Sequence, residues 1–330
     1  MTPPNPPLAT RTLPYGEAAI AEAAALIAAG AVVAVPTETV YGLAADATES
    51  RAVAGVYAAK GRPSFNPLIV HVLDRPAAEA IAVFDAEAGA LADAFWPGPL
   101  TLVLPLRAES GIASLVTAGL DTIAIRVPAH RAMRALLAVT GKPLAAPSAN
   151  ASGAISPTHA AHVLASLGGR IPLIIDDGAT EAGLESTIVM TRGGVRVLRP
   201  GPITGEDIAS LFPGEGRRSF TKPDAGPRPL PEKDAVTAPG QLESHYAPAK
   251  PLRINIADRS ADEWLIGFGP VSGDDTLSAT GDLTEAAAAL FAALHRADMS
   301  GKPRIAVAPI PETGLGVAIN DRLRRAAHRE

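Results

Sequence analysis

Polar side chains that could do chemistry follow an apolar run near the start of the sequence. The segment Pro36–Leu43 (PTETVYGL) comes directly after Ala31–Pro36 (AVVAVP), which reads as a buried strand. Two threonines and a glutamate at a strand end can line a binding site. The same residues can also cap the turn or helix that follows, so both interpretations stand at this point.

A second segment, Lys60–Pro67 (KGRPSFNP), carries Lys60 and Arg62 two residues apart among Gly and Pro. Two cations that point the same way from a constrained loop would suit a polyphosphate, although a charged loop is more often simply solvated. His71 lies in the apolar run Leu68–Val72. A lone histidine there is more often a hydrogen-bonded core residue than a ligand.

Arg126 is the most unusual residue, because it places a guanidinium inside the β-type run Thr122–Val127 (TIAIRV). A buried arginine needs a partner for its charge and its N–H groups. The partner is either an internal acid such as Asp176 or the carboxylate of a ligand. We favour the ligand.

The segment Ala145–Gly153 (AAPSANASG) follows a short apolar run with small and hydroxylated residues. Small side chains let a ligand approach the backbone, and Ser148 and Asn150 offer neutral donors to phosphate oxygens. A helix N-cap and turn is the alternative interpretation. Glu185–Thr187 and Leu198–Pro202 again place polar groups at the ends of short strands.

The elements that must position these residues alternate between strand and helix over residues 1–212. The expected strands are Ala31–Pro36, Leu68–Val72, Leu100–Leu106, Thr122–Val127, Leu144–Ala146, Leu173–Asp176 and Ser186–Met190. The expected helices are Glu17–Ala29, Ala86–Phe95 and Arg131–Val139. Such a strand-rich set predicts an α/β domain with a mixed, highly twisted sheet and flanking helices.

Residues 213–250 are rich in Pro, Gly and charge, which predicts an extended linker. Within it, His245–Pro248 (HYAP) carries residues that a structureless linker rarely needs, so we expect this part to dock on one of the domains. Strand and helix then alternate again, predicting a small parallel, Rossmann-like α/β domain over residues 251–330. Its expected elements are strands at Leu252–Ile256 and Arg304–Val307, and helices at Leu283–Asp298 and from Asn320 onward.

The composition narrows the possible functions. A chain of 330 residues exceeds what one hydrophobic core usually serves, so we expect two domains. The net charge of −5 argues against a protein that holds nucleic acid by bulk positive charge. The absence of Cys excludes disulfides, thiolate zinc sites, iron–sulfur clusters and a cysteine nucleophile, and it favours a cytoplasmic location.

Several common motifs are missing from the sequence. It has no G-x-x-x-x-G-K-[ST] loop, no G-x-G-x-x-G after a strand, no H-E-x-x-H and no nucleophile elbow. We therefore expect no metal site in the protein itself. No apolar run approaches about 20 residues, and Met1–Leu13 lacks the apolar core of a signal peptide, so we expect no membrane contact.

Taken together and in order, the motifs resemble the Sua5 branch of the YrdC/Sua5 family, the L-threonylcarbamoyladenylate synthases. They are PTETVYGL, KGRPSFNPLIVHV, WPGPLT, AGLDTIAIRVPAH, AAPSANASG, ESTIV, LRPGPI and HYAP. The resemblance is strong over residues 15–205. It is weaker over 251–330, where Gly314–Arg325 (GLGVAINDRLRR) matches most clearly.

The resemblance implies a reaction of L-threonine, bicarbonate or CO2 and ATP that gives threonylcarbamoyl-AMP, diphosphate and water. A separate tRNA threonylcarbamoyltransferase would use the product to modify the adenosine at position 37 of tRNAs, and a tRNA contact by this chain is not required. Mg²⁺ would arrive with ATP. Tyr246 on the linker would stack on adenine or close over the phosphates, excluding water.

The family pattern also assigns residues to roles. The family's catalytic set corresponds to Lys60, Arg62, Ser148 and Asn150. Threonine or its carbamate would be held by Thr39, His71, Arg126, the Ala146 backbone and Ser186. ATP would be held by Arg62, Asn66, Thr122, Ser148, Ser156, Arg199 and Tyr246, with Lys60 close by.

Two other functions remain possible on the sequence. One is an RNA-binding or ribosome-maturation module, against which the 14 basic and 18 acidic side chains of residues 1–212 argue. The other is a carbamoyl-transfer enzyme of the hydrogenase-maturation type. Chains of that type carry zinc-finger and acylphosphatase-like parts, which this Cys-free sequence lacks.

Overall fold

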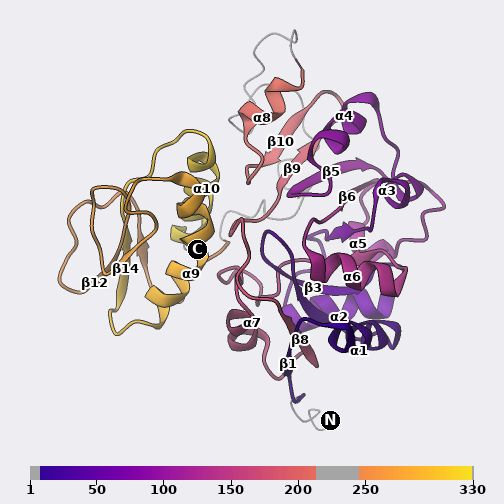
Figure 1. Ribbon diagram of the computed structural model, residues 1–330, viewed down its shortest axis with the longest axis horizontal. Helices are drawn as coiled ribbons and strands as arrows, with labels where there is room; N and C mark the ends of the chain where they lie inside the picture. Colours follow the sequence, from indigo (N-terminus) through magenta and orange to yellow (C-terminus); the bar gives the residue numbers. More distant parts are fainter. Residues whose placement is uncertain (1–7, 213–244, 329–330) are drawn as a thin grey trace.

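The computed structural model describes residues 8–212 and 245–328, which form a larger and a smaller lobe (Figure 1). The larger lobe has the strands β1 (Arg11–Pro14), β2 (Val33–Pro36), β3 (Tyr41–Asp46), β4 (Ile69–His71), β5 (Leu100–Pro105), β6 (Thr122–Arg126), β7 (Leu144–Ala145), β8 (Leu173–Asp176), β9 (Thr187–Met190) and β10 (Arg196–Arg199). Its helices are α1 (Glu17–Ala28), α2 (Ser50–Lys60), α3 (Arg75–Ile81), α4 (Ala86–Phe95), α5 (Ser114–Thr117), α6 (Arg131–Thr140), α7 (Ala160–Leu167) and α8 (Gly205–Ser210).

The strands of the larger lobe form one sheet in the order β1-β8-β2-β3-β7-β4-β6-β5-β9-β10. The pairs β1–β8, β2–β8, β4–β6 and β5–β9 are parallel, and the others are antiparallel. The expected mixed sheet is therefore confirmed. The elements that the sequence did not reveal are mostly short, and a strand of two to four residues carries little periodicity.

The segment Pro36–Leu43 forms the tip of a hairpin between β2 and β3. The Thr37 hydroxyl accepts hydrogen bonds from the backbone N–H groups of Thr39 and Val40, at 3.2 and 3.3 Å. This is the local capping that the sequence allowed. It holds the two threonines rigidly at the end of a buried strand.

The smaller lobe is a four-stranded sheet within the described residues, in the order β11-β14-β12-β13. Its elements are β11 (Leu252–Arg253), β12 (Glu263–Gly267), β13 (Asp275–Thr276), β14 (Arg304–Val307), α9 (Leu283–Met299) and α10 (Leu315–Ala327). All its strand pairs are parallel, as expected. Helices α9 and α10 lie between this sheet and the larger lobe (Figure 1).

Helix α10 begins at Leu315, so the expected start at Asn320 is wrong. Gly314 and Gly316 concealed the first turn, because glycine weakens a helical pattern. Gly316 is required there, since a Cβ atom would collide with the Pro311 carbonyl. Asn320 is buried inside the helix and donates its side-chain amide to the Ile310 carbonyl at 3.0 Å.

The two lobes meet along α9. Gly183 has a φ of +66°, and a Cβ atom there would collide with the backbone of α9 at Ala287 and Ala288. The apolar core of the smaller lobe continues into Leu184 and Tyr246. No helix in the described part of the chain is long and apolar enough to cross a membrane.

The predicted linker over 213–250 falls mainly on residues 213–244, which lie outside the described residues. Its last part is described, and it contacts both lobes. The Ala247 N–H donates to the Gly153 carbonyl at 2.8 Å, and the His245 N–H donates to the Arg325 carbonyl at 3.3 Å. The expectation that HYAP docks on a domain is confirmed.

Candidate active site

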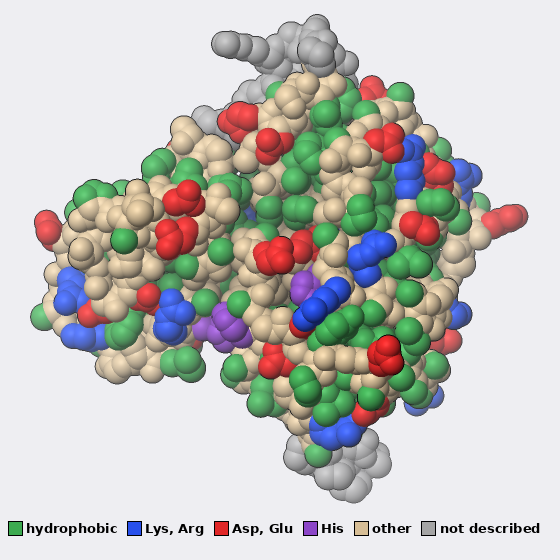
Figure 2. All heavy atoms as spheres, viewed as in Figure 1, with side chains coloured by type: hydrophobic (Ala, Val, Ile, Leu, Met, Phe, Trp, Pro, Cys, Tyr) green, Lys and Arg blue, Asp and Glu red, His purple; other side chains and the backbone are tan. Residues whose placement is uncertain are grey.

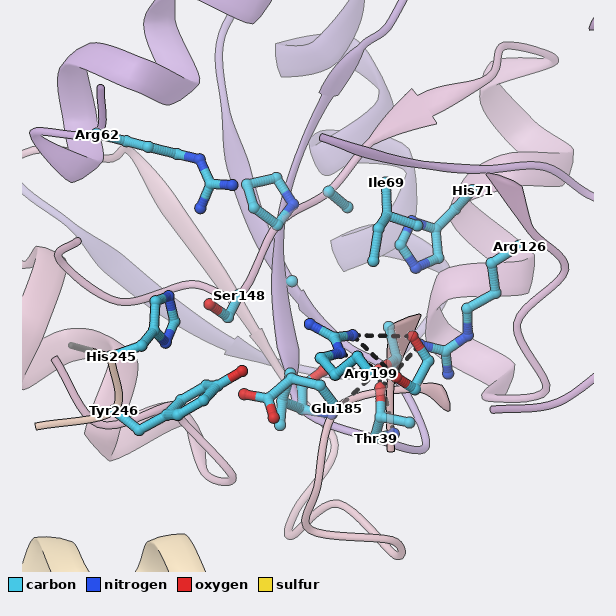
Figure 3. A pocket seen from close by; sticks show the side chains of 16 residues that line it. Thr39, Arg62, Ile69, His71, Arg126, Ser148, Glu185, Arg199, His245 and Tyr246 are labelled. Carbon is cyan, nitrogen blue, oxygen red and sulfur yellow. Dashed lines mark hydrogen bonds between the residues drawn. The ribbon is translucent and has the colours of Figure 1, made fainter. Parts of the chain in front are cut away.

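A pocket opens beside the β2–β3 hairpin, lined by residues of the larger lobe and by the end of the linker (Figure 3). It brings together nine of the residues predicted from the sequence. They are Thr39, Arg62, His71, Arg126, Ala146, Ser148, Ser186, Arg199 and Tyr246. His71 and Arg126 lie on one side of the pocket, Arg62 and Tyr246 lie on the other, and Arg199 lies between them (Figure 3).

The sheet places His71 and Arg126 side by side. Strands β4 and β6 pair in parallel with these two residues directly opposite each other, so both side chains share one face. Burial, together with the neighbouring Arg126 charge, lowers the pKa of His71 to about 3. His71 is therefore a neutral ring at physiological pH. No described residue hydrogen-bonds to its buried Nδ1 atom.

Arg126 is paired with an internal acid, and that acid is Glu38 rather than Asp176. The distance from Arg126 Nη2 to Glu38 Oε1 is 2.6 Å, and both side chains are buried. Burial alone would raise the pKa of Glu38, but Arg126 outweighs it, so this pKa lies below its usual value. Asp176 instead accepts a hydrogen bond from the Tyr41 hydroxyl at 3.3 Å.

Arg126 still faces the pocket after making this pair. Its Nη1 donates to the Thr39 hydroxyl at 2.9 Å and its Nε donates to the Gly98 carbonyl at 3.1 Å. These two hydrogen bonds use two of the five N–H groups of a guanidinium, and Nη2 faces Glu38 in the ion pair. Thr39 and Arg126 together form a polar corner suited to a carboxylate.

Ser186 and Arg199 line the middle of the pocket. Arg199 donates to the Ser186 carbonyl from Nε at 3.1 Å and from Nη2 at 3.0 Å. The Ser186 hydroxyl is 2.7 Å from the hydroxyl of Thr101 on β5. Strands β5 and β10, together with the residue just before β9, therefore hold this part of the pocket.

Lys60 and Arg62 do not act as the matched pair that their spacing suggested. Gly61 adopts a left-handed conformation with a φ of 60° and ends α2, so Lys60 lies in the last helical turn. The Lys60 ammonium donates to the Ser148 and Asn150 carbonyls, beneath the loop, and only Arg62 lines the pocket. Burial, and then Arg62, lower the pKa of Lys60 well below its usual value.

Five predicted residues do not line the pocket. They are Lys60, Asn66, Thr122, Asn150 and Ser156. Asn66 and Asn150 support the neighbouring loops: Arg62 donates to the Asn66 carbonyl at 3.3 Å, and the Asn150 amide donates to the Ala154 carbonyl at 2.8 Å. Thr122 is the first residue of β6 and is half-buried.

Glu185 is a pocket residue that its motif, Glu185–Thr187, did not reveal from the sequence. Glu185 lines the pocket and is buried. Its carboxylate accepts hydrogen bonds from the Ser156 hydroxyl and, at 2.8 Å, from Nε of Arg322 in α10. Neither partner is near Glu185 in the sequence, so no local signal could have revealed this group.

His245 and Tyr246 close the pocket on the side of the linker. Both are buried, and burial raises the pKa of Tyr246 and lowers that of His245 to about 3. The Tyr246 hydroxyl has no hydrogen-bond partner among the described residues and extends toward Glu185 (Figure 3). A buried hydroxyl of this kind is available to a bound molecule.

These features define a class of protein. It is an α/β protein with a buried, cation-rich pocket that would suit a small anionic substrate. Two family models match the chain. One, the Sua5–YciO–YrdC model described as telomere recombination, covers residues 25–201. The other, described as the C-terminal domain of threonylcarbamoyl-AMP synthase, covers residues 203–328.

Curated relatives match nearly the whole chain. It is 40% identical to the threonylcarbamoyl-AMP synthase of Bacillus subtilis, over 96% of this chain and 95% of that one. It is 39% identical to the enzyme of the same name from Pyrococcus abyssi, over 92% and 93% of the two chains. The chain belongs to the Sua5 branch of the YrdC/Sua5 family.

The fold agrees with this membership. The crystal structure of Pyrococcus abyssi Sua5 complexed with L-threonine matches 96% of this chain and 97% of that chain, with a TM-score of 0.85 and 37% sequence identity. The mixed larger sheet and the small parallel sheet therefore match the architecture of that Sua5 structure.

Proposed function

We propose that this protein synthesises L-threonylcarbamoyl-AMP from L-threonine, ATP and either bicarbonate or CO2. Diphosphate is released in both cases, and water is released as well when bicarbonate is the carbon source. The proposal rests on one observation, which is that a single pocket has two ends with different chemistry. Arg126 and a neutral His71 lie at one end, and Arg62 lies at the other, with Arg199 between them. The first end suits an amino acid and the second suits a polyphosphate.

At the amino-acid end, Arg126 and Thr39 would bind the threonine carboxylate. The amine must be neutral to add to CO2, and a carboxylate beside it would favour the ammonium form. The carboxylate behind Arg126, Glu38, is neutralised by that arginine. His71 is uncharged, so it does not repel an ammonium and does not attract one as a carboxylate would. It can orient the nitrogen by a hydrogen bond. With a pKa of about 3 it is a weak base, and we assign no general base.

At the phosphate end, a carbamate oxygen would attack the α-phosphorus in line, forming the O–P bond as the bond to diphosphate breaks. Such a transfer depends mainly on positioning and charge neutralisation. Arg62 and Arg199 would supply charge from the protein. Lys60 would hold the Ser148 loop in position.

We propose that Mg²⁺ arrives with ATP and neutralises its phosphates. Glu185 is an acid that lines the pocket, but both of its oxygens already accept hydrogen bonds within the protein. The product would pass to a tRNA threonylcarbamoyltransferase. We expect these steps in the cytoplasm, where ATP and tRNA are available.

The first test measures diphosphate release from ATP and bicarbonate, with L-threonine, with L-serine and with neither. We expect release that requires threonine. Release driven by carbamoyl phosphate instead would favour a carbamoyl-transfer enzyme. No threonine-dependent release from folded protein with Mg²⁺, together with steeply salt-dependent tRNA binding, would favour an RNA-binding module. Acidic and basic side chains are interspersed on the face seen in Figure 2, which argues against that module.

A further inference from the structure

A side chain from the smaller lobe reaches the wall of the pocket. Arg322, on α10, is completely buried, with 0% of its side chain exposed. Its Nε donates to Glu185 Oε2 at 2.8 Å, and its Nη1 donates to Asp321 Oδ2 at 2.8 Å. Arg322 does not itself line the pocket, whereas Glu185 does.

Glu185 depends on this contact for its position and its charge. Its other oxygen is held by the Ser156 hydroxyl, so Arg322 supplies the charged partner that a buried carboxylate needs. Burial alone would raise the pKa of Glu185. Arg322 and then Arg199 outweigh that effect, so the pKa lies below its usual value and Glu185 stays ionised.

An ionised Glu185 matters to the cations around it. Burial and Arg62 both lower the pKa of Lys60, and Glu185 opposes them. Burial also lowers the pKa of Arg199, and Glu185 again acts in the opposite sense. The carboxylate therefore limits the mutual repulsion of cations gathered for a polyphosphate.

Arg322 also contacts the linker. Its guanidinium lies 5.3 Å from the centre of the Tyr246 ring, and Phe291 of α9 packs against the same ring at 5.6 Å between centres. Tyr246 has a φ of +64°, which is costly for a bulky residue unless its surroundings hold it. Both pocket residues that Arg322 touches are thus oriented by the smaller lobe.

We propose that Arg322 is a positioning residue of the active site, through which the smaller lobe holds Glu185 and Tyr246 in their working geometry. The smaller lobe is then part of the catalytic apparatus rather than a separate module. This inference rests on the proposed function. It predicts that the effect of Arg322 on catalysis passes mainly through Glu185.

The test is a double-mutant cycle on threonine-dependent diphosphate release, using R322M, E185Q and the variant carrying both. We expect R322M to lower kcat/KM at least about tenfold in the wild-type background, but no more than about threefold in the E185Q background. R324M is the matched control, because Arg324 lies on the same helix with 52% of its side chain exposed and pairs with exposed Glu312. It should stay within about twofold of wild type.

The pH profile separates a positioning role from a merely structural one. Removing Arg322 raises the pKa of Glu185, so the acid limb of kcat/KM should move to higher pH in R322M. The limb should not move in R324M. R322K keeps the charge and should return the limb toward that of wild type.

The outcomes are distinct. An inactive wild type overturns the proposed function and this inference with it. An active wild type in which R322M costs the same factor in both backgrounds, or leaves the acid limb in place, overturns only the inference. If R322M does not fold, R322Q, which also removes the charge, takes its place in the cycle with the same equal-cost criterion. The combined R322M and E185Q variant leaves neither member of the buried pair alone.

Discussion

Two buried arginine–glutamate pairs border the pocket, and they face it in opposite orientations. In the first, Arg126 lines the pocket and Glu38 lies behind it, with 2.6 Å between the charged groups. In the second, Glu185 lines the pocket and Arg322 lies behind it, at 2.8 Å. The same chemistry therefore presents a cation to the pocket in one pair and an anion in the other.

The pairs also differ in where their members come from. Arg126 and Glu38 both belong to the larger lobe, on β6 and on the hairpin before β3. Arg322 belongs to α10 of the smaller lobe. The threonine end should therefore depend on the larger sheet alone, whereas the other end should depend on how the lobes dock.

Removing the cation that faces the pocket should have the largest effect on activity. Arg126→Ala should lower kcat/KM for threonine by about 10³-fold, or about 4 kcal/mol, because it removes the carboxylate site and leaves Glu38 buried without a partner. Steady-state diphosphate release would measure this. Adding Glu38→Gln should restore thermal stability but not activity. Recovery of activity in that double variant would argue against a substrate contact by Arg126.

The next largest effect concerns the support of the Ser148 loop. Lys60→Met should lower kcat/KM for ATP by about 10²-fold, because two carbonyls lose their donor and the loop loses its anchor. Lys142→Met is the matched control, since Lys142 is 52% exposed and lies 3.7 Å from Asp46. Similar losses in both variants would contradict a specific role for Lys60.

The pH dependence of folding would test the two ends of the pocket separately, because a buried histidine lies at each end. His71 and His245 each have a folded-state pKa of about 3, lowered by burial. The unfolded chain binds these protons near pH 6.5, so stability present above that pH is lost as the pH falls toward 3. Each should cost about 2 kcal/mol at pH 5.

Urea unfolding of wild type, His71→Gln and His245→Gln at pH 7 and pH 5 would measure these costs. Each variant should show a smaller difference between the two pH values than wild type. An unchanged difference would mean that the histidine titrates alike in both states.

The last prediction has the smallest effect and tests whether Tyr246 closes the pocket or only binds substrate. Tyr246→Ala should lower the yield of threonylcarbamoyl-AMP about tenfold more than diphosphate release, because water would reach and hydrolyse the labile product. Product chromatography alongside the diphosphate assay measures both. Tyr246→Phe keeps the ring and should stay closer to wild type. Equal losses in yield and release would argue against closure.

Another contact between the lobes is a histidine cluster that the proposed mechanism does not use. The rings of His162 on α7 and His295 on α9 stack with centres 3.8 Å apart. Histidine side chains are visible at the junction of the lobes in Figure 2. Burial and the adjacent histidines lower the pKa of His162 to about 3, so acid should weaken docking at this contact as well.

Most of the longer helices and strands could be predicted from the sequence alone. Helix α4 and strands β8 and β14 have the predicted bounds, because apolar spacing and capping residues act within a few positions of one another. The bounds of such elements are what short-range chemistry controls. The resemblance carried by the motifs, rather than short-range chemistry, pointed to nine residues that line the pocket.

Which charged side chains pair with each other depends on the tertiary structure. The sequence suggested a ligand carboxylate, or an internal acid such as Asp176, as the partner of Arg126, and the hairpin instead places Glu38 beside it. Lys60 and Arg62 are two residues apart, yet the left-handed Gly61 sends their head groups to different partners. Glu185 and Arg322 are 137 residues apart, and only the packing of α9 and α10 on the larger lobe joins them. Electrostatic pairing follows distance in space, which local sequence patterns do not encode.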